Sequence, residues 1–134
     1  MYPMIAVRVI LSNENGEILF LKRKNTNYAN GKWCLPGGKI EAFQKAEDVC
    51  KKEIKEETNL DISKIKFLFY NDDLPIKNES DMHFLGLYFT ANFSGKIMLN
   101  EESSEFSWIN PNELNKFDIA FNQDKIVKKF LIKI

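Results

Sequence analysis

Cysteine and histidine, on which many metal and redox sites depend, are nearly missing from this sequence. The 134 residues include two cysteines, Cys34 and Cys50, and one histidine, His83. Two cysteines are too few for a disulfide framework, and their spacing is not that of a zinc site. We therefore expect reduced thiols, as in a cytoplasmic protein, and we interpret His83 as an ordinary strand residue.

Net charge and long apolar runs are also lacking. Nineteen basic residues balance nineteen acidic ones, so no overall field would hold the protein on a nucleic-acid backbone or an anionic membrane. The sequence opens on a strand-like pattern without a basic leader, and no apolar run is long enough to cross a bilayer. We expect a cytoplasmic protein that binds neither nucleic acid nor membrane. A polyanionic ligand would have to be met by local charges.

Short β-branched and aromatic runs between polar turns predict strands over residues 4–11, 17–22, 65–70, 82–93 and 106–109. Pro111 suits the first turn of a short helix over 112–115. Apolar residues at helical spacing predict a closing helix over 121–132. With 44% hydrophobic residues, the chain suits one domain over 1–134 with a single core. Strands with an early and a terminal helix favour a mixed sheet between helices.

The most informative stretch is residues 37–60, GGKIEAFQKAEDVCKKEIKEETNL, a glycine turn that leads into a helix. At about 100° per residue, Val49, Cys50 and Ile54 share one side of this helix. These three residues predict the face that packs on the core.

Three glutamates, Glu53, Glu56 and Glu57, are interleaved with this apolar face, and the lysines of the helix fall on its far side. Acids at this spacing repel one another, and carboxylates withdrawn from water need a partner or must take up protons. Mg²⁺, a hard cation that prefers oxygen ligands, would supply the missing charge. The glutamates alone are also compatible with an ordinary solvated helix. Gly37 and Gly38, which allow the backbone to approach a ligand closely, favour a phosphate and metal site instead.

Residues 38–60 resemble the signature of the Nudix hydrolases, Mg²⁺-dependent enzymes that cleave a nucleoside diphosphate linked to another group. The positions that match in register are Gly38, Glu53, Ile54, Glu56, Glu57 and Leu60. Three positions depart from the signature, where Gln44 replaces glutamate, Lys52 replaces arginine and Asn59 replaces glycine.

The departures differ in their expected effect. Asn59 is mild, because asparagine tolerates the left-handed backbone that ends a helix. In the family the glutamate and arginine form an ion pair that braces the loop, so Gln44 and Lys52 predict weaker bracing. We expect this to affect rigidity or metal affinity more than reaction type. It also leaves open a nucleotide-binding module that has lost turnover.

The resemblance implies fold class α/β (α+β), a Nudix-type α/β/α sandwich with a mixed central sheet. It also implies that Glu56 and Glu57 bind Mg²⁺, or Mn²⁺, together with the carbonyl of Gly37 or Gly38. Glu53 would be a further ligand or the base that activates water. A divalent cation on this helix is therefore the expected cofactor.

Many members of the family add one more acid from a loop further along the chain. Glu101, Glu102 and Glu105 form the acidic cluster there, and we favour Glu105 because EFSWINPNEL is similar to a common ending of the family. An exposed loop acid is the alternative for Glu105. Trp108, in the same stretch, is expected in the core rather than against a base.

The opening strand, the PGGKIE loop and residues 117–129 are similar to the MutT-type branch, which hydrolyses nucleoside triphosphates to monophosphates. In that branch an asparagine before the terminal helix contacts the purine, and Asn122 is the matching position. Asparagine is also a good helix cap. Arg23, at the end of the second strand, and Lys39 are candidates to hold substrate phosphates, although Arg23 also suits a solvated strand end.

We therefore predict Mg²⁺-dependent hydrolysis of a (d)NTP to a monophosphate and pyrophosphate. The alternatives are a nucleotide-sugar or ADP-ribose pyrophosphatase, and a nucleotide-binding module without turnover. The expected partner is a small nucleotide substrate, and the protein would be a monomer or a homodimer.

Overall fold

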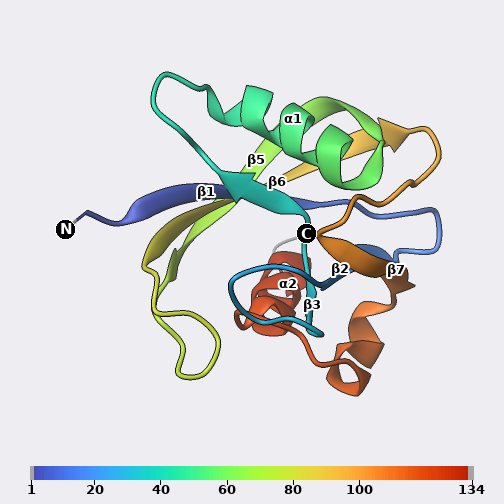
Figure 1. Cartoon of the computed structure of the whole chain (residues 1–134). Helices are drawn as coiled ribbons and strands as arrows, with labels where there is room; N and C mark the ends of the chain where they lie inside the picture. Colours follow the sequence, from blue (N-terminus) through green and yellow to red (C-terminus); the bar gives the residue numbers. More distant parts are fainter. Residues whose placement is uncertain (1, 133–134) are drawn as a thin grey trace.

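The computed structural model describes residues 2–132. Along the chain, the elements are β1 (Met4–Ile10), β2 (Ile18–Arg23), β3 (Trp33–Cys34), β4 (Gly37–Lys39), α1 (Ala46–Thr58), β5 (Asp61–Asp73), β6 (Phe84–Ser94), β7 (Ser103–Ile109), the 3-10 helix η1 (Pro111–Lys116) and α2 (Gln123–Ile132). The two α-helices lie on opposite sides of the strands (Figure 1).

The strands form two sheets. One has the order β4-β1-β6-β5 and the other β3-β2-β7. The first sheet is mixed, because β1 runs parallel to β6 but antiparallel to β4. Helix α1 packs against β4, β1 and β5. The layered α/β fold with a mixed sheet is therefore confirmed, with the difference that a separate antiparallel sheet completes the strand layer.

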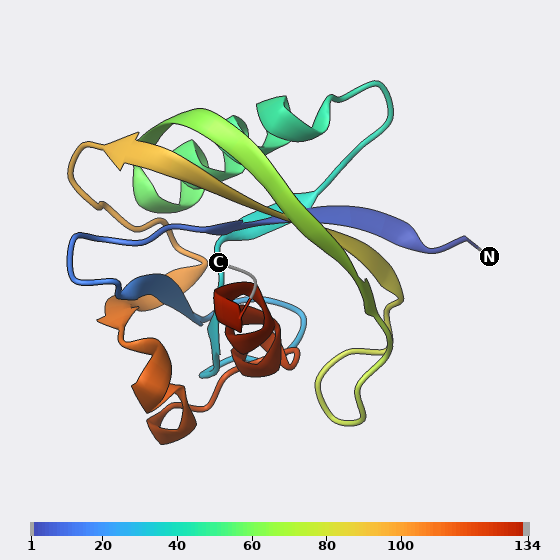
Figure 2. The ribbon, with the colours of Figure 1, turned by 180° about the vertical axis from the view of Figure 1, so that it is seen from behind.

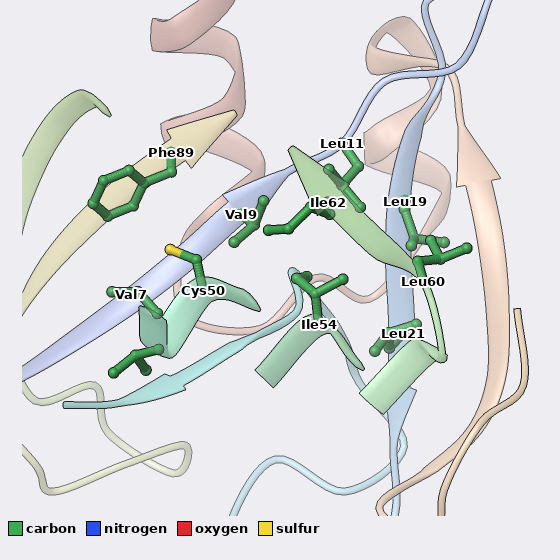
Figure 3. Packing of buried hydrophobic residues seen from close by; sticks show 11 residues of the cluster. Val7, Val9, Leu11, Leu19, Leu21, Cys50, Ile54, Leu60, Ile62 and Phe89 are labelled. Carbon is green, nitrogen blue, oxygen red and sulfur yellow. The ribbon is translucent and has the colours of Figure 1, made fainter. Parts of the chain in front are cut away.

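Helix α1 buries the predicted face. Val49, Cys50 and Ile54 are each no more than 1% exposed, and they pack with β1, β2 and β5 residues in one cluster (Figure 3). The helix ends as predicted at Asn59, whose backbone is left-handed with φ 66° and whose N–H donates to the Lys55 carbonyl. Because this face of α1 is buried in the cluster, the orientation of the helix about its axis is fixed, and with it the side that faces β4.

A second apolar cluster lies beneath α2. It includes Phe20, Tyr88 and Val127, which come from β2, β6 and α2. The side chain of Gln123, 1% exposed, accepts a hydrogen bond from the Leu35 N–H at 2.6 Å. This buried bond ties the first turn of α2 to the segment between β3 and β4.

The glycine segment differs from the prediction. Gly37 and Gly38 belong to strand β4, opposite Arg8 and Val7 of β1, so the predicted glycine turn was wrong. A Cβ atom at Gly37 would overlap the Val7 carbonyl. Glycine is required here because two backbones come close together, rather than because the chain reverses.

Strand β5 is much longer than predicted. It covers Asp61–Asp73, because β6 pairs along its whole length through two register irregularities. The β5–β6 loop lies on the same side of the strands as α2, as the view from behind shows (Figure 2). The loop that follows β5 therefore begins only after residue 73, and this end of β5 reaches the α2 side of the molecule.

Several smaller predictions can be checked directly. Both cysteines are free and buried, and burial raises the pKa of the Cys50 thiol to about 12. Trp108 stacks on Phe93, with ring centroids 5.4 Å apart, and is a partly buried residue at the margin of the core that packs against the α1 cluster. His83 is exposed and directly precedes β6. None of the helices within residues 2–132 is long and apolar enough to cross a bilayer.

Replacing Ile54 with alanine tests the packing of α1. The side chain is 0% exposed, so we expect Ile54→Ala to lower the free energy of unfolding by about 2–5 kcal/mol in urea denaturation. Ile5, which is 42% exposed on β1, is the control. Ile5→Ala should change the free energy of unfolding by only about 0.5 kcal/mol. Similar losses in both variants would contradict the assigned face of α1.

Candidate active site

A pair of carboxylates on α1 faces strand β4. Glu57 Oε2 is buried and has no hydrogen-bond partner among the described residues. Burial raises the pKa of Glu57 well above its ordinary value of 4.5. The positive charge of Arg8 and the Gly37 N–H oppose this rise, and the charge of Glu53 adds to it. A buried acceptor of this kind calls for a cation or a proton.

Glu53 lies one helical turn before Glu57 and is partly buried. Burial is the main cause that raises its pKa, and the charge of Glu56 raises it further. A Cβ atom on Gly38 would come within 2.5 Å of the Glu53 carboxyl carbon. The missing side chain of Gly38 thus makes room for this carboxylate against the β4 backbone.

Glu56 points away from the pair. Its side chain is 53% exposed, and Oε1 lies 3.7 Å from the Lys52 ammonium. The expectation that no lysine lies among the three acids was therefore wrong, because Lys52 is one turn from Glu56 along the solvent edge of α1. Gln44 accepts a hydrogen bond from the Glu41 N–H at 2.9 Å, so it supports its own loop while Lys52 supports the helix.

The carboxylate pair fits a hard cation that is shared with a substrate. Within residues 2–132, no three His, Cys, Asp or Glu side chains form a complete metal cluster. Mg²⁺ in nucleotide enzymes commonly uses one or two carboxylates and fills its other positions with substrate phosphates and water. Glu53, the unpartnered Glu57 oxygen and a backbone carbonyl at Gly37 or Gly38 match that kind of site.

The downstream acids are placed differently from one another. Glu105 lies on β7, and its carboxylate is 3.4 Å from the Lys22 ammonium, with 59% of the side chain exposed. The charge of Glu102, by contrast, acts on Glu53 and raises its pKa. Asn100 holds this loop in place, since its amide donates to the Glu56 carbonyl at 3.1 Å and its oxygen accepts from the Glu102 N–H at 3.0 Å. This asparagine two residues before Glu102 was the sequence signal for a structured turn.

A cavity of about 460 Å³ lies between α2, β1 and the β5–β6 loop, a volume typical of nucleotide-sized ligand sites. Arg8, Arg23, Asp73, Phe121 and Asn122 are among the residues that line it. Lys39 is exposed on β4 and is not part of this lining. The cavity thus brings together two of the three predicted substrate residues, Arg23 and Asn122, and the third, Lys39, lies outside the cavity.

Two arginines converge on one aromatic ring at the cavity. The guanidinium carbons of Arg8 and Arg23 lie 6.0 Å and 5.1 Å from the centre of the Phe121 ring, within the range of a cation–π contact. The Phe121 N–H donates to Glu79 of the β5–β6 loop at 2.8 Å. The loop and the segment before α2 are therefore held together around the cavity.

Asn122 does not cap α2 with its side chain. Its backbone is left-handed, with φ 56°, whereas capping residues are usually extended. Its backbone carbonyl accepts from the N–H groups of Lys125 and Ile126, but its side-chain amide has no hydrogen-bond partner in the described part of the chain. This amide remains available to a ligand in the cavity.

Arg8 links the carboxylate pair to the cavity, and sequence reasoning missed it. Its guanidinium donates to the Leu35 carbonyl at 3.0 Å. Its positive charge opposes the rise in pKa that burial causes at Glu57 on one side and at Asp73 on the other. An arginine within the apolar run MIAVRVI was the signal, because a charged residue on a central strand needs a reason to be there.

The buried carboxylate gives the metal-free protein a specific pH dependence. The folded state keeps a proton on Glu57 that the unfolded chain releases near pH 4.5, so the free energy of unfolding should fall as the pH rises above this value. In EDTA, we expect Tm to fall between about pH 5 and about pH 8, and Glu57→Gln to reduce the fall.

The same variants test metal binding. At the higher pH, Mg²⁺ should raise the Tm of the unaltered protein by mass action, and should raise that of Glu57→Gln much less. Glu47→Gln, on the exposed part of α1, is the control and should follow the unaltered protein. Identical pH profiles for all three proteins would show that Glu57 is not the titrating group.

Comparison with known proteins agrees with this arrangement. The family model of the NUDIX domain matches residues 2–130. An ADP-ribose pyrophosphatase of Methanocaldococcus jannaschii is 32% identical over 98% of this chain and 75% of its own length. The nucleoside triphosphatase NudI of Escherichia fergusonii is 27% identical over 82% of this chain and 84% of its own.

Solved structures share the fold. A MutT protein from Methanosarcina mazei Go1 superimposes with a TM-score of 0.82 at 23% identity, covering 98% of this chain and 95% of its own. The NUDIX domain of Shewanella oneidensis NrtR, solved with ADP ribose, gives 0.79 at 17% identity, with 99% and 89% covered. This chain belongs to the NUDIX domain family and is a Nudix hydrolase.

Proposed function

We propose that this Nudix hydrolase converts nucleoside triphosphates to monophosphates and pyrophosphate with Mg²⁺, for which Mn²⁺ can substitute. The observation that carries the proposal is the position of Arg8, which lines the cavity and pairs with Gly37 of β4, so that its charge acts on both Glu57 and the cavity residue Asp73. A molecule with a phosphate chain at one end and a base at the other matches this pair of adjoining sites.

The metal would be held by Glu53 and Glu57, with the carbonyl of Gly37 or Gly38. Glu56 is proposed to join this site by exchanging its Lys52 ion pair, which is exposed and therefore weak. When bound, the cation would supply positive charge to the phosphate oxygens and lower the pKa of an attacking water. The reaction adds water across one phosphoanhydride bond.

Proton transfer and phosphate binding would fall to side chains around this helix. Glu53 is proposed as a metal ligand or as the base that activates the attacking water, because its carboxylate lies against Gly38 of β4, one helical turn before Glu57. Glu105 was predicted as the additional acid, but Glu102, whose charge reaches Glu53, suits that role better. Arg23, which lines the cavity, would bind the phosphate nearest the nucleoside, and Lys39 on β4 would bind the outer part of the phosphate chain.

The cavity would hold the nucleoside. Phe121 offers an aromatic edge that is fixed between two arginines, and Asn122 offers an unpaired amide for the base. We further propose a cytoplasmic setting, in keeping with two reduced, buried cysteines.

The relative from M. jannaschii, an ADP-ribose pyrophosphatase, favours a second candidate function, the cleavage of ADP-ribose or a nucleotide sugar. Incubation with Mg²⁺ and a panel of substrates separates the candidates. Triphosphate hydrolysis would release pyrophosphate, and conjugate hydrolysis would release ribose phosphate or sugar phosphate. Nucleotide binding without any product would indicate a module that has lost turnover.

Glu57→Gln tests the catalytic role of the buried carboxylate. It removes one charge at nearly constant volume, and we expect kcat to fall by at least about 100-fold, the size of effect seen when electrostatic stabilisation of a transition state is lost. Glu47→Gln should retain full activity. Undiminished Mg²⁺-dependent turnover in Glu57→Gln would show that the catalytic metal is not bound by this helix.

Asn122→Ala tests base recognition. If the free amide contacts the base, its loss should reduce discrimination among nucleotides by about 1–3 kcal/mol. We expect Tm to change little, because the side chain makes no hydrogen bond within the described protein. Steady-state kcat/KM values for several triphosphates measure the discrimination. Unchanged selectivity together with a lower Tm would instead indicate a structural role.

A further inference from the structure

The wall of the cavity contains a carboxyl group that the proposed metal site does not use. Asp73, at the end of β5, accepts a hydrogen bond from the Asn71 amide at 2.6 Å. The hydroxyl of Tyr88, a residue 1% exposed, lies 3.3 Å from Asp73 Oδ2. Two donors from two strands therefore fix the orientation of this carboxylate.

Gly86 of β6 provides the space that Asp73 occupies. A Cβ atom at this position would overlap Asp73 Oδ2 and lie 2.9 Å from the Tyr88 ring. Gly86 lies opposite Asn71 in the β5–β6 pairing, so three neighbouring positions on two strands combine to hold the group inward. The adjacent Asp72 is exposed, which shows that a solvated position was available one residue away.

The fixed carboxylate retains unused acceptor capacity. An ionised carboxylate has about four lone-pair sites, and Asn71 and Tyr88 are its only hydrogen-bond donors within residues 2–132. Burial raises the pKa of Asp73, while the Asn71 amide, the Arg8 charge and the Tyr88 hydroxyl favour the ionised form. A group that only accepts hydrogen bonds selects ligands that present donors.

We infer that the cavity is a guanine site, in which Asp73 accepts hydrogen bonds from N1–H and the N2 amino group of the base. These two donors are adjacent on guanine and match the two oxygens of one carboxylate. Adenine presents an acceptor at N1, which would face the carboxylate and be repelled, so the same group excludes the competing purine. The inference rests on the proposed function, in that the cavity holds the nucleoside of the substrate.

Asn122 lines the same cavity and complements this reading. Its amide both donates and accepts, whereas the O6 and N7 atoms of guanine are acceptors. The amide can therefore serve the edge of the base that Asp73 leaves free. Adenine conjugates such as ADP-ribose would lack the Asp73 contact, so the guanine site argues against ADP-ribose as the substrate.

The unaltered protein provides the first test. With Mg²⁺, kcat/KM should be about 10-fold higher for GTP than for ITP, which lacks the N2 amino group, and about 100-fold higher for GTP than for ATP, in line with the discrimination of a bidentate base contact. Equal values for the three triphosphates would overturn the guanine assignment and leave triphosphate hydrolysis standing.

Asp73→Asn supplies the second test, because the amide keeps the volume but replaces one of the two acceptor oxygens with an NH2 donor. It should lower the GTP to ATP ratio at least about 10-fold, mainly through loss of GTP turnover. Asp61→Asn, at the exposed far end of β5, is the matched control and should keep the original ratio. An unchanged ratio in a folded Asp73→Asn variant would overturn the role of Asp73.

Product binding in EDTA separates this inference from the hydrolysis itself. GMP should raise the Tm of the unaltered protein more than AMP does at the same concentration. If GMP is preferred but no substrate is cleaved, the proposed function fails and the guanine site stands. Equal shifts with GMP and AMP would count against the guanine site whatever the turnover.

Discussion

A carboxylate oxygen that is withdrawn from water is the constraint on which this structure depends. Glu57 Oε2 is buried and has no hydrogen-bond partner within residues 2–132, and the neighbouring Glu53 adds negative charge beside it. Such an arrangement costs stability unless a proton or cation is supplied. The glycines of β4 serve this pair, because Gly37 permits the close approach to β1 and Gly38 leaves room for the Glu53 carboxylate.

The scaffold joins this charged site to a nucleoside-sized cavity through β1. Val7 and Val9 of β1 pack in the cluster with α1, and Ile10 packs in the cluster beneath α2. The charge of Arg8 on the same strand acts on both Glu57 and Asp73. The loop between β5 and β6 closes the other side through the bond from the Phe121 N–H to Glu79. The residues proposed for hydrolysis, on α1 and β4, and those proposed to contact the base, on β5 and before α2, therefore lie on different elements on either side of Arg8.

The residues that follow local rules were predictable from the sequence. Helical periodicity identified the buried face of α1, and the tolerance of asparagine for left-handed backbone explained Asn59 as the helix end. Periodicity could not distinguish Glu56 from Glu57, since it gives an angle around the helix but not which strand covers that angle. The Lys52 contact depends on side-chain reach along the helix. Arg8 and Asp73 acquire meaning only when distant strands pair, as at Gly86, and no local pattern contains that information.

Crystals grown with Mn²⁺ in place of Mg²⁺ would test the central claim most directly, because anomalous scattering locates the ion without reference to activity. We expect an anomalous peak within bonding distance of Glu57 Oε2 and adjacent to Glu53. A fully occupied Mn²⁺ peak elsewhere, with Glu57 still unliganded, would contradict the assignment of the buried carboxylate as the metal site.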